Sequence, residues 1–341
     1  MIKRIVVKAM VIVMLISFVS SEVYACPAIR GFPTSLQNHL VYEPVRLNGN
    51  IGIEPLENQR ITGWSVDWGD GSKVTKGTGL VVDVTKKDGY SKVGDYTIVI
   101  TVNWEYYDKK AKVWKPGDPN AVIGNKRASV KVGIKLVKVS PISAVPIICG
   151  VGETLKDMLK VKAVGYGDKS VKNVTVSFSL SSPEGGGGLV LPSSMVTKGN
   201  GEASTTLTIG DKEGEYVVTA SSAFLIGEEV TFKFNAKFGS ISGMVYEKPK
   251  KSKEEAPLPG AVVDLYRNTV KVGEEITSEI IVGAYKFVNV KPSVEEHGKN
   301  YRVNAWKTPG YKPSEGVWSQ PFDVKPGEEY KVEKLILTRL W

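Results

Sequence analysis

Apolar and polar residues alternate with a period of two along most of the chain beyond residue 25. The clearest run is residues 96–104, where Tyr, Ile, Ile, Val and Trp occupy every second position and Thr, Val, Thr and Asn lie between them. The same alternation recurs in residues 174–180 and 301–305. Because successive side chains of a strand point to opposite faces, each run predicts a strand with one buried face.

Turn-forming sequences separate these runs. Gly-Asp-Gly, Lys-Asp-Gly, Gly-Asn-Gly and Pro-Gly recur at intervals of roughly 8 to 15 residues, the spacing typical of β-sandwiches. No convincing helix of ten or more residues follows the first 25. The predicted fold class is therefore all-β, built of tandem sandwiches. At roughly 100 to 150 residues per domain, 341 residues are enough for two or three of them.

The first 25 residues differ from the rest. Lys3, Arg4 and Lys8 precede the apolar run 9–19, and a short polar region ends at Ala25. This order is typical of a secretory signal peptide, and the apolar run is too short to span a bilayer. We therefore expect an exported protein, extracellular or at the cell surface.

Cys26 follows the predicted cleavage site directly, and two outcomes are open for it. Val23-Tyr24-Ala25-Cys26 partly resembles the lipobox of bacterial lipoproteins, which implies acylation of Cys26 and the only membrane contact that we expect. Ordinary cleavage after Ala25 fits equally well. In that case Cys26 could form a disulfide with Cys149, because about 14 extended residues reach roughly 46 Å.

Composition shifts divide the mature chain into a leader at 26–39 and three segments at 40–138, 139–238 and 239–341. Two prolines in the segment 140–146 cannot donate to a strand ladder, so we expect a connector there. A second joint is expected at 238–240, where one apolar strand ends and the next begins. Connectors this short predict a semi-rigid chain of three folding units.

The first segment contains the stretches Trp64-Ser-Val-Asp-Trp-Gly-Asp-Gly-Ser72 and Val93-Gly-Asp-Tyr-Thr-Ile-Val-Ile-Thr-Val102. Through these two stretches it resembles PKD (polycystic-kidney-disease) domains. The stretch from Trp104 to Arg127 is longer than the hairpin usual in that family.

The middle segment contains the strand pattern at 174–178 and the stretches Thr197-Lys-Gly-Asn-Gly-Glu-Ala203 and Gly214-Glu-Tyr-Val-Val-Thr-Ala220. Through these residues it resembles bacterial Ig-like domains of the invasin and intimin kind. In that family such modules usually act as spacers.

The last segment has its characteristic stretches at residues 239–245, 258–266, 283–290 and 301–313. Through these residues it resembles the carboxypeptidase regulatory-like, transthyretin-type sandwich. It departs from that pattern at 277–282, where apolar residues replace a polar turn. The resemblance implies no peptidase residues.

Candidate chemistry is sparse. Two His and two Cys in the whole chain exclude most zinc sites and hydrolytic triads. Asp67 and Asp70 lie close together in a turn, and the sequence of this turn accounts for both aspartates without catalysis. Their carboxylates are hard oxygen ligands suited to Ca²⁺, but the regular run of Asp and Asn that would complete a calcium site is missing. We therefore predict no enzyme activity and no cofactor, with Ca²⁺ at this turn as the alternative.

The candidate ligand surface is the long insertion in the first segment. Trp104, Tyr106, Tyr107 and Trp114 lie there among several lysines, and flat rings beside cations suit sugar rings or anionic polymers. The alternative is a hairpin that these aromatic residues merely stabilise. Residues 26–138 also hold 17 Lys and Arg against 11 Asp and Glu, nearly the whole basic excess of the mature chain.

The predicted function is a non-catalytic binding, adhesion and spacer protein, with a cell-wall polymer, glycan or surface protein as partner. Nucleic acid is not expected, because the chain is exported and has no known reader motif. Two alternatives stay open. One is a non-catalytic accessory component of a secreted system that degrades polysaccharide or protein, and the other is a structural element of an envelope layer that assembles through strand edges.

Overall fold

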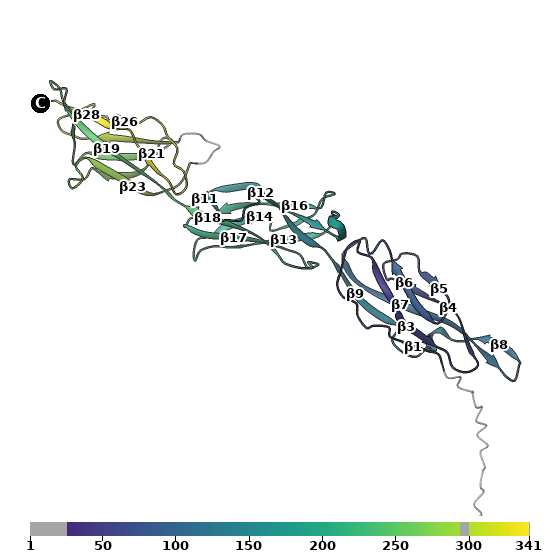
Figure 1. Cartoon of the computed structure of the whole chain (residues 1–341). Coiled ribbons are helices and arrows are strands. Elements are labelled where there is room, and N and C mark those ends of the chain that lie inside the picture. The colour runs from purple at the N-terminus through teal and green to yellow at the C-terminus, as the bar shows by residue number, and fades with distance from the viewer. Residues whose placement is uncertain (1–25, 294–299, 341) are drawn as a thin grey trace, which may run out of the picture. The chain divides into compact units, whose positions relative to one another are not determined.

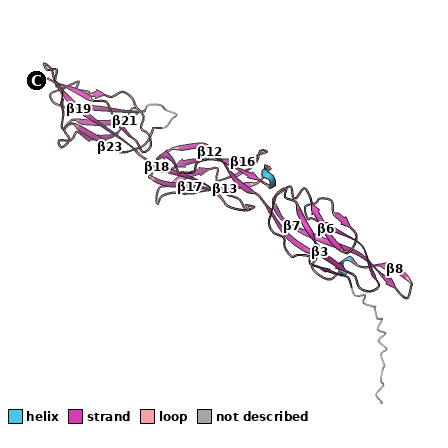
Figure 2. Cartoon of the chain, viewed as in Figure 1, coloured by secondary structure: helices cyan, strands magenta, loops and turns pink. Residues whose placement is uncertain are grey.

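The computed structural model describes residues 26–293 and 300–340, and most of them lie in strands (Figures 1 and 2). The helices among these residues are two short 3-10 turns, η1 (Pro119–Ala121) and η2 (Tyr166–Asp168). The all-β prediction is confirmed. No described helix has the length and apolar character needed to cross a membrane. The predicted signal peptide, residues 1–25, lies outside the described residues.

The first sandwich consists of a three-stranded sheet in the order β1-β3-β6 and a larger sheet in the order β2-β9-β7-β4-β5, with β8 paired to β7. Its strands are β1 (Ala28–Arg30), β2 (His39–Leu40), β3 (Val45–Glu54), β4 (Gln59–Asp67), β5 (Thr75–Gly77), β6 (Val81–Lys86), β7 (Gly94–Asp108), β8 (Val113–Pro116) and β9 (Arg127–Gly133). The period-two run at 96–104 lies in β7, where Ile98, Ile100, Val102 and Trp104 are buried.

The segment 26–39, expected as a leader, contributes to this sandwich. Ala28, Ile29 and Arg30 pair antiparallel with the end of β3. Ile29 and Phe32 are buried, which explains why the segment packs against the sheet.

The middle sandwich has the sheets β10-β12-β16-β14 and β11-β18-β17-β13-β15. Its strands are β10 (Lys135–Ser140), β11 (Ile147–Gly150), β12 (Thr154–Val164), β13 (Thr175–Ser181), β14 (Gly188–Leu191), β15 (Ser194–Val196), β16 (Glu202–Ile209), β17 (Gly214–Ser221) and β18 (Val230–Lys237). Alternate side chains of these strands form the core, as in β17, where Tyr216, Val218 and Ala220 are fully buried.

This topology places the proline-containing segment differently from the prediction. Strand β10 pairs with β12, so residues 135–140 already belong to the middle sandwich. Residues 141–146 therefore join two strands of that sandwich, β10 and β11, instead of joining two sandwiches. The prolines interrupt the ladder where the chain passes from one sheet to the other.

The last sandwich is organised around β19. One sheet has the order β20-β19-β28-β25, with β23 and β27 also paired to β19, and the other has the order β22-β21-β24-β26. Its strands are β19 (Gly239–Pro249), β20 (Ala256–Pro257), β21 (Val262–Arg267), β22 (Val270–Ile276), β23 (Ala284–Val290), β24 (Tyr301–Trp306), β25 (Tyr311–Lys312), β26 (Val317–Trp318), β27 (Glu329–Lys331) and β28 (Leu335–Arg339). Ile241, Val263, Leu265, Val303 and Leu337 belong to its buried core.

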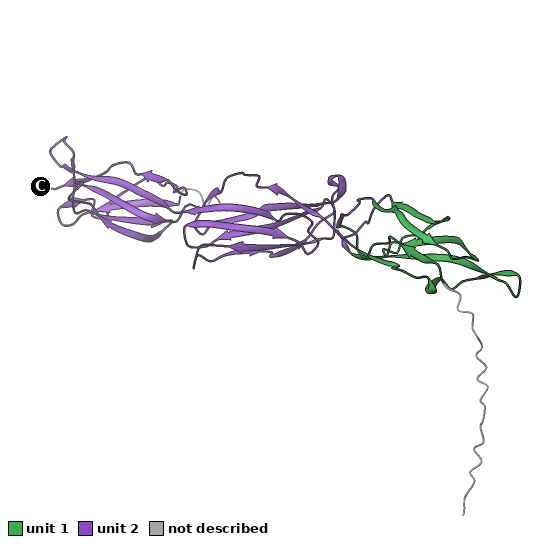
Figure 3. Cartoon of the chain, turned by 60° about the horizontal axis from the view of Figure 1, so that its bottom comes forward, with its two compact units in different colours: residues 1–37, 45–86, 95–130 green, residues 38–44, 87–94, 131–341 purple. Residues whose placement is uncertain are grey.

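Contacts divide the chain into two compact units (Figure 3). One comprises the described residues through Gln37, Val45–Lys86 and Asp95–Val130, and it contains most of the first sandwich. The other comprises Asn38–Pro44, Lys87–Gly94 and the chain from Lys131 onward, with the middle and last sandwiches. The division into three independently folding segments stays a prediction.

Candidate functional site

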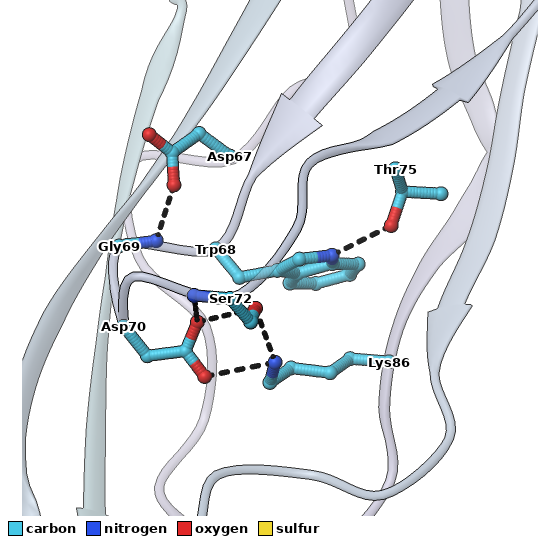
Figure 4. Close-up of polar contacts among 7 residues, drawn as sticks. All are labelled: Asp67, Trp68, Gly69, Asp70, Ser72, Thr75 and Lys86. Carbon is cyan, nitrogen blue, oxygen red and sulfur yellow. Dashed lines mark hydrogen bonds and ion pairs between the residues drawn. The ribbon is translucent and has the colours of Figure 1, made fainter.

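The Trp-Gly-Asp-Gly turn after β4 is held by its own side chains (Figure 4). Asp67 accepts a hydrogen bond from the backbone N–H of Gly69 at 2.9 Å. Gly69 has a φ of +76°, and a Cβ there would lie 2.4 Å from the carbonyl oxygen of Thr97. The indole of the buried Trp68 donates to Oγ1 of Thr75 at 2.9 Å. The turn therefore requires glycine and a carboxylate for structural reasons.

Asp70, the other candidate calcium ligand, forms an ion pair. Its carboxylate accepts from the N–H and the hydroxyl of Ser72 at 3.1 and 2.6 Å, and Nζ of Lys86 lies 2.8 Å away. Burial acts to raise the pKa of Asp70, but the hydrogen bonds from Lys86 and Ser72 outweigh it, and the pKa is lowered. A calcium ion here would have to displace the Lys86 ammonium. No group of three or more potential metal ligands occurs within residues 26–293 and 300–340.

The predicted aromatic surface lies on the β7–β8 hairpin, and its four residues point to both faces of it. Trp104 is only 4% exposed and donates its indole N–H to the carbonyl oxygen of Asp118 at 3.0 Å. Tyr106, two residues along the same strand, has its ring centre 6.1 Å from that of Trp104. Trp104 therefore belongs to the core of the hairpin, and Tyr106 lies on the same side.

The opposite face carries Tyr107 and the exposed Trp114. Tyr107 and Trp114 are direct cross-strand partners, with ring centres 5.5 Å apart in an edge-to-face arrangement. The guanidinium carbon of Arg60 lies 4.4 Å from the Trp114 ring centre, and Arg60 also pairs with Glu105 at 2.5 Å. Trp114 remains 38% exposed. We call Arg60, Glu105, Tyr107 and Trp114 the Trp114 face.

The tip of the same hairpin is basic. Asp108 accepts hydrogen bonds from the N–H groups of Lys110 and Ala111 and pairs with Lys115, and this last contact is the main reason why the pKa of Asp108 is lowered. The turn itself exposes Lys109, Lys110 and Lys112. The aromatic rings of Tyr107 and Trp114 thus lie on the same hairpin as a cluster of exposed cations.

Strand β11 carries Cys149, which is a buried free thiol. Burial, reinforced by the charge of Glu153, raises the pKa of Cys149 to about 12. Cys26 is half-buried just before β1. A bond between the two cysteines and the acylation of Cys26 both stay predictions.

A groove of about 730 Å³ lies on the last sandwich, between β19, β22 and β23. Met244, Tyr246 and Ile276 provide apolar lining. Two of its lysines pair with acids, Lys286 with Glu329 at 3.0 Å and Lys334 with Glu255 at 2.6 Å. The groove therefore has little net charge with which to attract an ionic ligand.

Comparisons with known proteins do not assign this chain to a family. No model of a known protein family and no curated protein matches the sequence. Among solved structures, the D00-D0 domain of intimin is 14% identical, with 62% of this chain and 98% of that one covered and a TM-score of 0.24. BcpA, the major pilin subunit of Bacillus cereus, is 14% identical over 81% of this chain and 94% of its own, with a TM-score of 0.33. Titin domains I67-I69 are 13% identical over 92% and 99%, with a TM-score of 0.30. At such TM-scores these likenesses decide neither family nor activity.

Proposed function

We propose that this protein is a non-catalytic binding and spacer protein, exported to the cell surface or the extracellular space, which binds an anionic glycan or wall polymer through the β7–β8 hairpin. The observation that carries the proposal is the Trp114 face beside the basic tip. An exposed indole is held in place by Tyr107 on one side and Arg60 on another. A ring fixed in this way loses little conformational freedom when a sugar stacks on it.

The tip supplies the attraction for negative charge. Lys109, Lys110 and Lys112 are exposed in the turn between β7 and β8. The turn leads directly into β8, the strand that carries Trp114. Several like charges gathered in this way raise the local concentration of an anionic polymer, whereas the aromatic rings provide the short-range contact.

Edge-to-edge assembly, the structural alternative, has weaker support. Strand β22 is the edge of its sheet, but its register shifts between Leu265 and Tyr266, so that Val272 has no partner on β21. A bulge of this kind is a device that discourages an edge strand from pairing with another chain.

The proposal is tested by binding of the mature chain to teichoic acid, peptidoglycan, alginate and heparin at low salt. We expect retention on at least one of these polymers and at least about tenfold weaker binding by a Tyr107→Ala, Trp114→Ala double variant. Tyr166→Ala is the matched control, because this tyrosine is 51% exposed on the middle sandwich. The polymer should keep its chain length during incubation. Binding that the double variant retains in full would refute the site, and shortened polymer would refute the non-catalytic function.

A further inference from the structure

A second set of aromatic residues comes together on the last sandwich, from positions far apart in sequence. On β21 and β24, Tyr266 pairs with Arg302 and Val262 pairs with Trp306. On β24 and β26, Asn304 pairs with Trp318. Because directly paired residues lie on the same face of a sheet, and residues two apart on one strand do as well, Tyr266, Trp306 and Trp318 share one face.

This face is the outward one. The residues between them, among which are Val263, Leu265, Val303 and Ala305, form the buried core on the other side of the sheet. The ring centres of Tyr266 and Trp318 are 4.9 Å apart, and the guanidinium carbon of Arg302 lies 5.8 Å from the Trp318 ring centre. Trp318 is 43% exposed. We call Tyr266, Arg302, Trp306 and Trp318 the Trp318 face.

A buried carboxylate holds this face in position. Asp264 lies between the aromatic residues, is only 6% exposed, and accepts the indole N–H of Trp306 at 3.0 Å. Its other oxygen is 2.7 Å from Nζ of Lys271, which also contacts Glu274. Burying a charge costs free energy unless it is paired, so these contacts fix the carboxylate and, through it, the Trp306 ring. The rings are therefore held in place before any ligand arrives.

The charge on this face differs from that of the hairpin tip. Lys271 lies between two acids, Asp264 and Glu274, and Arg302 is set against an aromatic ring. No cluster of cations comparable to Lys109, Lys110 and Lys112 adjoins the described part of the face. An anionic polymer would thus gain little here. A neutral chain of sugar rings matches better, since its C–H faces can cover the indoles and its hydroxyl groups can bond to the charged side chains at the rim.

We propose that the last sandwich carries a second saccharide site, the Trp318 face, which binds a neutral polysaccharide. This inference extends the proposed function but rests on different residues. The protein would hold a neutral polysaccharide through one sandwich and an anionic polymer through another.

The test is retardation of the full mature chain in native gels that contain hydroxyethyl cellulose, xylan, galactomannan or laminarin. We expect retardation by at least one of them, and Trp318→Ala should raise the apparent Kd at least about tenfold. Trp318→Phe, which keeps a ring, should stay within about threefold of the native chain. Trp306→Phe keeps the ring but loses the N–H that Asp264 accepts, so a partial loss is expected from poorer positioning. Thermal unfolding of each variant verifies that the sandwich is intact.

This experiment tests the two proposed sites independently. Trp114→Ala should leave the retardation by neutral polysaccharide unchanged, and Trp318→Ala should leave binding of the anionic polymer unchanged. If none of the four neutral polysaccharides retards the native chain, or if a folded Trp318→Ala chain is retarded as strongly, the inference is overturned. The proposed function would still stand if Trp114→Ala abolished binding of the anionic polymer.

Discussion

Gly117 offers a direct test of how the candidate hairpin is packed. It follows β8 immediately, and its N–H donates to the carbonyl oxygen of Trp104 at 2.8 Å, which fixes its position. A Cβ on Gly117 would lie 2.2 Å from Cε2 and 2.3 Å from Cδ2 of the Trp104 ring. Gly117 is not in the left-handed region, so a Gly117→Ala substitution brings this clash without backbone strain.

The cost follows from what the Trp104 ring must give up. The ring is 4% exposed, and moving it by about an ångström would break the indole hydrogen bond to Asp118. Overpacking a core typically costs about 1 to 3 kcal/mol, and a lost hydrogen bond about 0.5 to 1.5 kcal/mol. We expect Gly117→Ala to destabilise the first sandwich by about 2 to 4 kcal/mol.

Gly52→Ala provides the matched control. Gly52 lies on β3, and a Cβ there meets no atom within 4 Å. The same substitution should leave stability unchanged or raise it by up to about 1 kcal/mol, because alanine restricts the unfolded chain more than glycine does. Urea unfolding followed by tryptophan fluorescence and near-ultraviolet circular dichroism measures both variants. Equal midpoints for Gly117→Ala and Gly52→Ala would refute the packing argument.

Three further outcomes follow from the structure. Cys149, with its pKa raised to about 12, should react with Ellman's reagent at pH 8 only after unfolding, since the thiolate is the reactive form. The neutral thiol stabilises the fold fully below its unfolded pKa of about 8.5, and this stabilisation is lost as the pH rises towards 12. Fast labelling of the native chain would contradict the burial of Cys149. Lys86→Met should destabilise the first sandwich by about 1 to 3 kcal/mol at pH 7 relative to Lys87→Met, a substitution at an exposed position. This difference in unfolding free energy should vanish as the pH falls through the lowered pKa of Asp70, because the ion pair stabilises the fold only while Asp70 is ionised. A difference that persists at pH 2 would exclude the ion pair as its cause. Trypsin should first cut after Lys250, Lys251 or Lys253 in the turn between β19 and β20, and an earlier cut inside a sandwich would count against this order of stability.

Period-two alternation was enough to predict the strands and their buried faces, because a strand buried on one side imposes that pattern directly. The alternation also indicates which face of the hairpin each aromatic residue occupies, which the composition of the insertion does not. Trp104 and Tyr106 are two positions apart and Tyr107 is out of phase with them, so alternation alone places Tyr107 on the opposite face from the buried Trp104. Treating all four aromatic residues as one surface overlooked that phase.

The Trp318 face could not be predicted from the sequence, for a different reason. Its rings come from three strands, and only the cross-strand register sets Arg302 beside Tyr266 and Asn304 beside Trp318. Trp306 was the available signal, since it continues the outward phase of Arg302 and Asn304. The role of the segment 140–146 was likewise hidden, because prolines mark an interrupted ladder both between two sandwiches and between two sheets of one sandwich.

Binding at the two aromatic surfaces should depend differently on salt concentration. Attraction to the exposed cations at 109–112 acts over distances that mobile ions screen, with a Debye length of about 8 Å at 0.15 M and about 3 Å at 1 M. Stacking on Trp318 acts at van der Waals contact, and Lys271, on β22 of the same sheet, is already paired with acids. High salt should therefore weaken binding at the hairpin and leave the last sandwich nearly unaffected. If both proposals hold, we expect the chain to retain a neutral polysaccharide at a salt concentration that releases an anionic one, which a single surface with both functions could not do.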